Sequence, residues 1–380
     1  MLNNQSEIAI IGGGVVGLSV AIGLLQSGHK IIVYDGEDSD ARASFGNFGL
    51  VWGQGKGWNF APYAKLTVDA IAAWEDFSKN LNDLSGLDVS LDQNGGFEFF
   101  TDPDKLNNFI SMLEIQKGHA GNRFNYEALS GDELRNQIPG IGSKVVGATF
   151  SQLDGHINPL RFLRALRRAV KVLGGQIKSN SNVKKITSNK DGGFSLILAN
   201  GSVTSSEKVI LCAGLGAIKL ADQLAFKTNI RPERGELLIT EKLGDQLPFI
   251  SSTIRQVDEG GIQIGGTHAD VGMDDNETLD SVINSLKSTP ELEINFKEAP
   301  LAKMNEIILV HPETHIKKIF SNIPKEGLVG VEKEPYADTM LCPNSRNAIL
   351  RSCGAVIAAA DELMLHNERI FCATRPPGVL

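Results

Sequence analysis

The sequence predicts an α/β fold in which a Rossmann-like domain is interleaved with an α+β second domain and followed by an atypical carboxyl-terminal part. Three observations predict this arrangement. A glycine-rich turn joins a buried strand to a helix near the amino terminus, the later segment Lys208–Gly214 is a buried strand ending in Ala-Gly, and the composition changes near residue 300. The chain is therefore expected to leave its first domain and return to it.

The first element is a nearly complete dinucleotide-binding fingerprint. The apolar run Ile8–Ile11 predicts a buried parallel strand, and Gly12 permits the tight turn that leaves it. Gly14 lets the backbone approach a pyrophosphate, and Gly17 lets the following helix pack against the strand. Phosphates would then meet free amides at the positive end of that helix. The turn therefore predicts an adenine dinucleotide site.

An acidic residue ends the second strand of the fingerprint. The strand Lys30–Tyr34 is followed by Asp35, whose carboxylate can accept hydrogen bonds from ribose hydroxyls. A carboxylate disfavours a 2′-phosphate, so NADP is not expected.

Bulk properties exclude several other classes. The chain has 380 residues, a net charge of −8 and four cysteines, without the ligand spacing of a zinc site. The charge argues against nucleic acid as a partner, and the cysteine pattern suggests a reducing compartment with neither metal site nor disulfides. Residues Ile8–Leu25 carry no charge, but the fingerprint explains them as a buried strand and helix. We expect a cytoplasmic protein without a membrane span.

Later segments favour FAD over NAD. The run Ala43–Leu50 offers glycines and short polar side chains to a diphosphate and a flavin edge, Asn182–Ile186 predicts a further strand, and Lys208–Gly214 returns to the dinucleotide domain. An NAD dehydrogenase is the less favoured alternative, because a simple enzyme of that class does not need a chain that leaves the dinucleotide domain and returns to it.

These motifs resemble the D-amino-acid oxidase (DAO) family of FAD-dependent oxidoreductases over about residues 5–295. They are Gly12–Gly17, Ser44–Gly49, Asp154–Pro159, Cys212–Gly214, Arg231–Glu236 and Ile264–Thr267. The resemblance implies a GR2-type flavoprotein fold with FAD as its cofactor. It also implies that FAD is lined by Gly12, Gly13, Gly14, Val16, Gly17, Asp35, Ser44, Asn47, Gly49, Val183, Ala213 and Gly214.

The resemblance further implies oxidation of a C–N bond by hydride transfer to flavin N5. The substrate class is a small amino acid or secondary amine, such as a D-amino acid, glycine, sarcosine or a hydroxyproline-like compound, and the final acceptor is oxygen or another electron acceptor. Such a site mainly positions the substrate carbon and neutralises its carboxylate, for which a guanidinium is suited.

Four residues are candidates for catalytic roles. Arg234 lies in the Arg231–Glu236 motif and is a candidate for the carboxylate, as is Arg255, while a solvated or structural arginine is the simpler interpretation of either. His268 follows the Gly-Gly-Thr motif and would border the substrate, or it is a hydrogen-bonded loop histidine. Trp52 begins a glycine-rich loop that covers the flavin or is held there by packing alone.

The pattern divides the chain into pieces. Residues 5–60 and 145–215 are assigned to the FAD-binding domain, 61–144 and 216–295 to the substrate domain, and 300–380 to a foreign-looking tail. A helix is expected over Pro62–Asn80 with Leu66, Ala70, Ala73, Trp74 and Phe77 on its buried face. A second is expected over Pro159–Leu173, with Leu160, Leu163, Leu166 and Val170 buried and five basic residues solvated.

The tail lacks the motifs that close the DAO family. Over about residues 304–378 it resembles the amino-terminal part of a histone deacetylase or acetylpolyamine amidohydrolase, through His311–Glu313, Asp338–Met340, the expected helix Asn347–Leu365 and Phe371–Gly378. The catalytic histidines and zinc ligands of that family are missing, which argues against a deacetylase. The hypothesis is a fusion or rearranged reading frame, and the alternative to an active enzyme is a non-catalytic flavin-binding remnant.

Overall fold

The chain folds into two compact units. The computed structural model describes residues 5–36, 43–235, 237–244, 247–266, 269–270, 297–309, 312–325, 329–330 and 340–366. One unit comprises Met1–Leu237 and Lys242–Asp270, and the other comprises Leu238–Glu241 and Val271–Leu380.

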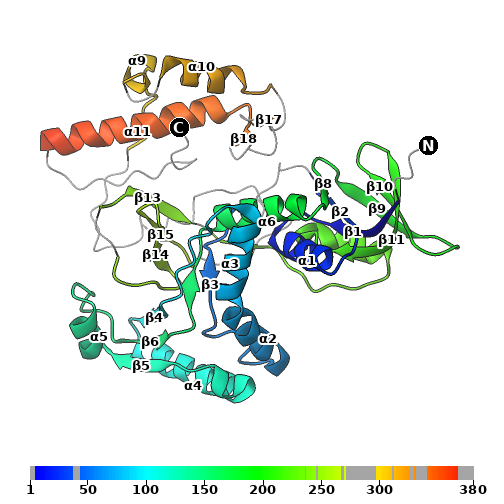
Figure 1. Ribbon diagram of the computed structural model, residues 1–380. Coiled ribbons are helices and arrows are strands. Elements are labelled where there is room, and N and C mark those ends of the chain that lie inside the picture. The colour runs from blue at the N-terminus through cyan, green and yellow to red at the C-terminus, as the bar shows by residue number, and fades with distance from the viewer. Residues whose placement is uncertain are drawn as a thin grey trace. The chain divides into compact units, whose positions relative to one another are not determined.

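A six-stranded sheet forms the centre of the dinucleotide-binding part (Figure 1). Its strand order is β8-β2-β1-β11-β10-β9, in which β1 is parallel to both β2 and β11, β8 is parallel to β2, and β10 is antiparallel to its neighbours. Its strands are β1 (Gln5–Ile11), β2 (Ile31–Tyr34), β8 (Gln176–Lys178), β9 (Val183–Ser188), β10 (Phe194–Leu198) and β11 (Val203–Leu211). The expected strands are confirmed, except that the strand expected over Lys208–Gly214 is the end of a longer strand, β11, which stops at Leu211.

Helices cover both faces of this sheet, because the side chains of β1 alternate between them. On one face, Ile8 and Ile10 pack in a cluster with Leu18 of α1 (Val15–Gln26) and Leu166 of α6 (Pro159–Val172). On the other face, Ala9 and Ile11 share a cluster with Leu220 of α7 (Ala217–Gln223). A short 3₁₀ helix, η2 (Gly214–Gly216), connects β11 to α7.

A second, antiparallel sheet supports the other part of this unit. Its strand order is β4-β6-β5, and α4 and α5 contact it. The elements are β4 (Gly96–Phe100), β5 (Glu127–Ser130), β6 (Gly147–Ser151), α4 (Pro103–Ala120), η1 (Gly121–Arg123) and α5 (Gly131–Gln137). β3 (Leu50–Val51), which precedes this sheet in the chain, pairs antiparallel with β7 (Gly155–His156), which follows it.

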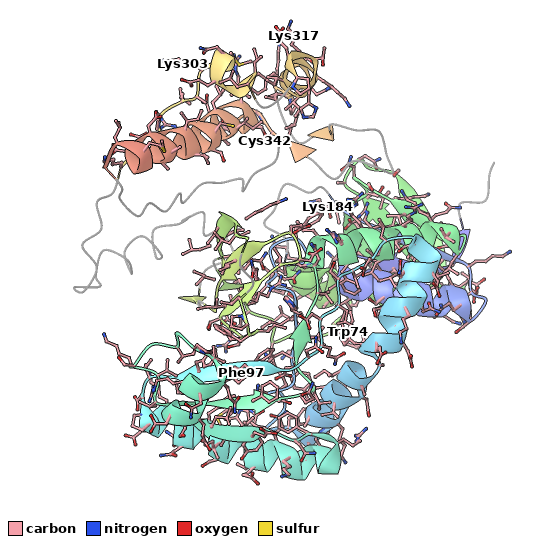
Figure 2. The ribbon with its side chains drawn as sticks, turned by 60° about the vertical axis from the view of Figure 1, so that its left-hand side comes forward. Trp74, Phe97, Lys184, Lys303, Lys317 and Cys342 are labelled. Atoms are coloured by element: carbon pink, nitrogen blue, oxygen red, sulfur yellow. The ribbon has the colours of Figure 1, made fainter. Side chains whose placement is uncertain are left out.

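The expected helix over 62–80 is two helices. They are α2 (Ala61–Ala72) and α3 (Trp74–Ser85), which meet at Ala73. The expected buried face is wrong for α2: Leu66 is 65% exposed, and Ala64, Val68 and Ile71 are buried instead. The break explains the error, because a single 3.6-residue period cannot be carried across two helix axes. Figure 2 labels Trp74 on α3, which contacts the rings of Phe77 and Phe162.

The face of α6 is mostly as expected. Leu163, Leu166 and Val170 are buried, whereas Leu160 is 52% exposed because it lies in the first turn, outside the stripe that faces the sheet. The expectation that all five basic residues are solvated is wrong, since Arg161 and Arg167 form ion pairs with residues of other segments.

The remaining strands of the first part of the chain are short. β12 (Glu233–Arg234) pairs with β16 (Ala269–Asp270), and β14 (Ile254–Gln256) pairs with β15 (Gly261–Ile264), both antiparallel. β13 (Leu238–Lys242) follows β12 in the chain.

The second unit has its own apolar core. Its elements are α9 (Met304–Ile307), α10 (Glu313–Ser321), β17 (Val329–Gly330), β18 (Met340–Leu341) and α11 (Ser345–His366), so the expected helix over 347–365 is confirmed. Ile307 and Ile316 pack with Leu350 and Cys353, while Ile319 and Leu341 pack with Ile349. Among the described residues, no helix is both long and apolar enough to span a bilayer.

Candidate functional site

The glycine-rich turn leaves no room for side chains. Gly12 has φ +110°, and a Cβ built on it would lie 2.3 Å from the carbonyl oxygen of Cys212. A Cβ on Gly17 would lie 2.0 Å from the Gly12 carbonyl oxygen. Both contacts are with backbone, which cannot move aside, so helix α1 can approach β1 and β11 this closely only with glycine at these positions.

The third glycine of the turn faces a side chain instead of backbone. A Cβ on Gly14 would lie 2.8 Å from Ser44 Oγ, and this hydroxyl accepts a hydrogen bond from the Val15 N–H at 3.1 Å. Ser44 is therefore drawn against the amino terminus of α1, where Asn47 Nδ2 donates to its carbonyl oxygen at 3.0 Å. The structure thus joins the 44–49 stretch to the glycine turn.

Asp35 lies beneath the same turn. Its carboxylate is buried, and Oδ1 accepts a hydrogen bond from the Gly13 N–H at 3.0 Å. Oδ2 is 3.4 Å from Arg167 Nη1 of α6, and Arg167 also donates to Ser179. Sequence reasoning missed Arg167, because nothing in a basic helix face indicates which arginine meets a residue 132 positions away.

The last FAD-lining candidates come from two strand ends. Ala213 follows β11, and its Cα would lie 2.9 Å from a Cβ on Gly12. Val183 begins the outer strand β9 and is buried, and nearby Ser181 donates its N–H to the Asp35 carbonyl oxygen at 2.6 Å. The structure therefore brings the segments before β9 and after β11 to the fingerprint.

Trp52 is held by a carboxylate that sequence reasoning missed. Its indole Nε1 donates a hydrogen bond to Glu98 Oε1 at 3.1 Å. The ring packs so closely on Gly96 that a Cβ at this position would lie only 2.3 Å from it. Ser252 Oγ donates to the other oxygen of Glu98 at 2.5 Å. Burial raises the pKa of Glu98, although these two hydrogen bonds oppose the shift. The only feature of the sequence that indicates a role for Glu98 is the presence of an acid in the otherwise apolar strand β4.

The loop after Trp52 is anchored by a second carboxylate. Asp154 is fully buried and accepts hydrogen bonds from the Gly53 N–H at 2.5 Å and from Gln54 Nε2 at 2.9 Å. Burial raises the pKa of Asp154 to about 7, and the charge of Glu98 acts in the same direction. Trp52, Gly53 and Gln54 are buried in this network, and a role of this loop as a cover of the flavin stays a prediction beside packing alone.

Arg255 is the most buried large side chain of the site. It is 1% exposed on β14, and its Nη1 is 2.6 Å from His156 Nδ1 and 3.0 Å from the Ile157 carbonyl oxygen. Burial, followed by the charge of Arg255, lowers the pKa of His156 to about 4, so the imidazole is neutral and accepts the guanidinium N–H. Because Arg255 is buried, the alternative of a solvated arginine at this position is excluded.

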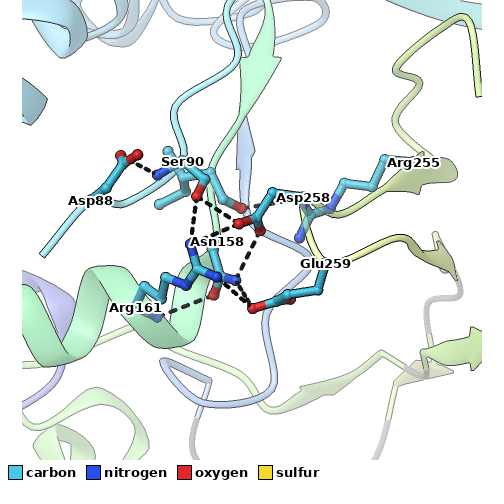
Figure 3. A network of polar contacts seen from close by, with 8 residues as sticks. Asp88, Ser90, Asn158, Arg161, Arg255, Asp258 and Glu259 are labelled. Carbon is cyan, nitrogen blue, oxygen red and sulfur yellow. Dashed lines mark hydrogen bonds and ion pairs between the residues drawn. The ribbon is translucent and has the colours of Figure 1, made fainter. Parts of the chain in front are cut away.

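A polar network lies next to Arg255 (Figure 3). Arg161 of α6 forms ion pairs with Asp258 at 2.7 Å and Glu259 at 2.9 Å, both in the turn between β14 and β15. Asn158 Nδ2 donates to the same two carboxylates, and Ser90 donates to Asp258 at 2.9 Å. The network fixes the β14–β15 hairpin to the start of α6.

Two catalytic candidates remain predictions. Arg234 lies in β12 opposite Ala269, but its side chain is outside the described residues. His268 also falls outside them. Among the residues that the structure describes, no group of three or more His, Cys, Asp or Glu side chains is arranged to hold a metal ion.

The sheet, the glycine turn and the buried acid after β2 define a Rossmann-type dinucleotide-binding flavoprotein. The family model for FAD dependent oxidoreductases (DAO) matches residues 7–292, and the chain belongs to this family. Its cofactor is FAD, and the glycines whose Cβ positions are filled form a turn that fits the cofactor's pyrophosphate.

Relatives and solved structures agree with this assignment. The chain is 38% identical over 263 residues to a subunit of the opine oxidase of Rhizobium meliloti, covering 69% of this chain and 70% of that protein. The crystal structure of glycine oxidase from Geobacillus kaustophilus superimposes with a TM-score of 0.65 at 19% identity, over 98% of this chain and 100% of that one. The FAD-bound L-α-glycerophosphate oxidase of Mycoplasma pneumoniae gives a TM-score of 0.58 at 18% identity, over 70% and 72%.

The carboxyl-terminal part matches a different family. The histone deacetylase domain model matches residues 273–378, so the two family matches overlap over residues 273–292. The tail of this flavoprotein therefore resembles a deacetylase, as its motifs indicate.

Proposed function

We propose that this chain oxidises the C–N bond of a small amino acid or secondary amine. The observation that carries the proposal is the cradle formed by Gly12, Gly14 and Gly17 together with Ser44 and Asp35, in a chain whose relatives include opine and glycine oxidases. When bound, FAD supplies the hydride acceptor at N5 of its ring.

The chain's own residues bind and orient in this proposal. Amides at the start of α1 meet the pyrophosphate, and Asp35, held by Gly13 and Arg167, faces the ribose. Trp52, which follows the 44–49 stretch in the chain, is oriented by its hydrogen bond to Glu98. Arg234 remains the proposed partner of the substrate carboxylate, and His268 remains a proposed residue at the border of the substrate pocket.

Absorption spectroscopy of the purified chain tests the proposal first. We expect bands in the blue and one FAD released per polypeptide on denaturation. An opine, glycine, sarcosine, D-proline and hydroxyproline are then offered, both with oxygen and with an artificial electron acceptor, since the relative is one subunit of an oxidase. Bleaching of the flavin by one of these amines supports the proposal, and a protein that stays colourless after incubation with FAD refutes it.

A second candidate function is a flavin-binding remnant without turnover. The observation that favours it is the match of residues 273–378 to histone deacetylases where the DAO family carries its last flavin contacts. Stoichiometric FAD that no amine reduces would support the remnant. Re-sequencing codons 290–310 from source DNA tests the fusion itself, and a continuous flavoprotein frame there would contradict it.

A further inference from the structure

Two facing side chains of the β14–β15 hairpin have buried polar atoms without partners. Arg255 and Gln263 are directly opposite each other in the antiparallel register, so their side chains project from the same face of the hairpin. Within the described structure, Nε and Nη2 of Arg255 and Oε1 of Gln263 are buried and make no hydrogen bond. Two donors and one acceptor are therefore left for a group that the protein does not supply.

The guanidinium needs such a group for electrostatic reasons. Burial lowers the pKa of Arg255 to about 10, so the side chain is still cationic at neutral pH. Its Nη1 contacts are the neutral His156 and a carbonyl oxygen, and its other close neighbour is the Phe48 ring, 5.3 Å from Cζ. The charges of Asp258 and Glu259 also act on it, but Nε and Nη2 have no acceptor, and buried donors without acceptors are unfavourable, so a bound acceptor is expected.

These unpartnered atoms lie against the stretch that the proposed function assigns to the flavin. Nη2 of Arg255 is 2.8 Å from the Cβ that Gly49 would carry, and Gly49 has φ +81°. The Phe48 ring lies 3.0 Å from a Cβ built on Gly265, directly after β15. Phe48 and Gly49 thus lie next to Gly265, which follows β15, and to the Arg255 side chain of β14.

We propose that Arg255 and Gln263 bind the polar edge of the FAD isoalloxazine ring. The pyrimidine part of this ring presents carbonyl oxygens and ring nitrogens as acceptors and one N–H as donor, which complements two guanidinium donors and an amide oxygen. This inference rests on the proposed function.

The assignment has a consequence for the redox properties. A ring that has accepted a hydride gains two electrons and one proton, and the reduced ring without a further proton is an anion. A cation at its polar edge stabilises that form and raises the reduction potential. Sulfite adds to N5 and also leaves negative charge on the ring, so sulfite affinity reports the same interaction without substrate turnover.

The test compares holoprotein variants at the arginine. Arg255→Gln is expected to weaken sulfite binding at least tenfold and to lower the midpoint potential, while Arg255→Lys retains most of both. Arg168→Gln is the matched control, since Arg168 is exposed on α6, and it is expected to leave both values unchanged. Gln263→Leu retains the charge and is expected to shift the visible absorption band and speed FAD loss on dialysis.

Several results would overturn the assignment. Sulfite affinity and potential in Arg255→Gln equal to those of Arg168→Gln would exclude a flavin contact, and a change confined to the KM for the amine would assign Arg255 to the substrate carboxylate. If Arg255→Gln fails to fold, an unshifted spectrum in Gln263→Leu with wild-type FAD retention overturns it instead. Failure of the proposed function looks different, because the wild-type chain itself would then hold no FAD.

Discussion

At the scale of single residues, burial moves two neighbouring groups in opposite directions. Asp154 and His156 are two positions apart in the Asp154–Pro159 motif, and the same desolvation raises the pKa of the carboxyl and lowers that of the imidazole. Both shifts favour the neutral form. The motif thus carries two groups that lose charge on folding, which makes stability near this site sensitive to pH.

The His156 shift predicts a loss of stability in acid. Its folded pKa of about 4 lies below the ordinary value of 6.5, so the unfolded chain binds the proton first as the pH falls, and stability is lost between these values. His156→Gln still accepts the Arg255 N–H but does not titrate. Between pH 6.5 and 4, wild-type unfolding free energy is expected to fall by up to about 1.4 kcal/mol per pH unit more than that of the variant. Urea denaturation at several pH values measures this, and parallel curves would contradict it.

The glycine cradle predicts a separation of cofactor binding from stability. In Gly14→Ala the new methyl group lies 2.8 Å from Ser44 Oγ, and it is expected also to obstruct the approach of the phosphate to the turn. FAD content is expected to fall at least tenfold. Adding Ser44→Gly removes the clash with the hydroxyl but not the obstruction, so the double variant should regain thermal stability and remain without flavin. Recovery of FAD in the double variant would show that only the clash mattered.

At the scale of the element, helix α6 connects several segments of the first unit. One face packs against the sheet, and the other directs Arg161 to the β14–β15 turn and Arg167 to Asp35. The helix begins with Asn158, whose side chain accepts the Arg161 N–H, followed by Pro159 in the first turn. The residues at its first turn therefore determine where the helix begins, whereas the tertiary structure determines which residues Arg161 and Arg167 contact.

The apolar face of α6 predicts unequal effects of two leucines. Leu163 is 2% exposed and Leu160 is 52% exposed. Leu163→Ala is expected to cost about 2–5 kcal/mol of unfolding free energy, because it opens a cavity against β1, whereas Leu160→Ala should cost less than about 0.5 kcal/mol. Equal urea midpoints for the two variants would contradict the observed face.

The polar face of α6 predicts a specific arginine effect on FAD. Arg167→Met removes the cation from Asp35, leaving a buried carboxylate with fewer partners at the ribose end of the site. The Kd for FAD is expected to rise several-fold, since a partly exposed ion pair contributes about 1 kcal/mol. Arg168→Met, one position later and exposed, is the control, and fluorescence titration of FAD measures both. Identical Kd values in the two variants would rule out this role.

At the scale of the whole molecule, the apolar clusters of the described residues follow the two units. Clusters around Leu166, Leu196 and Leu113 contain residues of the first unit alone, and clusters around Ile316 and Ile319 contain residues 302–357. Separate cores are expected to unfold with separate responses to mutation.

This separation predicts two distinguishable thermal transitions. Ile316→Ala is expected to lower the Tm of one transition and leave the temperature of flavin release unchanged, whereas Leu166→Ala should lower the temperature of flavin release. Calorimetry and flavin fluorescence, recorded in parallel on the full chain, measure the two events. If both variants shift both events equally, the two cores fold as one cooperative unit.

The sequence by itself determined the parts of this protein that depend on short-range geometry. The strand, the glycine turn, helix α1 and Asp35 lie within residues 5–35, so sterics and periodicity were sufficient to predict both the turn and its ligand class. Family motifs also identified the flavin and the deacetylase-like tail.

Only the tertiary structure decided which charged side chains meet. Trp52 and Glu98 are 46 residues apart, Arg255 and His156 are 99 apart, and Arg167 and Asp35 are 132 apart. No local pattern encodes such pairs, because an arginine or a glutamate is compatible with a solvated surface as well as with a buried site. Burial and the identity of the facing group arise from chain folding, and those two quantities determine charge, pKa and the atoms left free for a ligand.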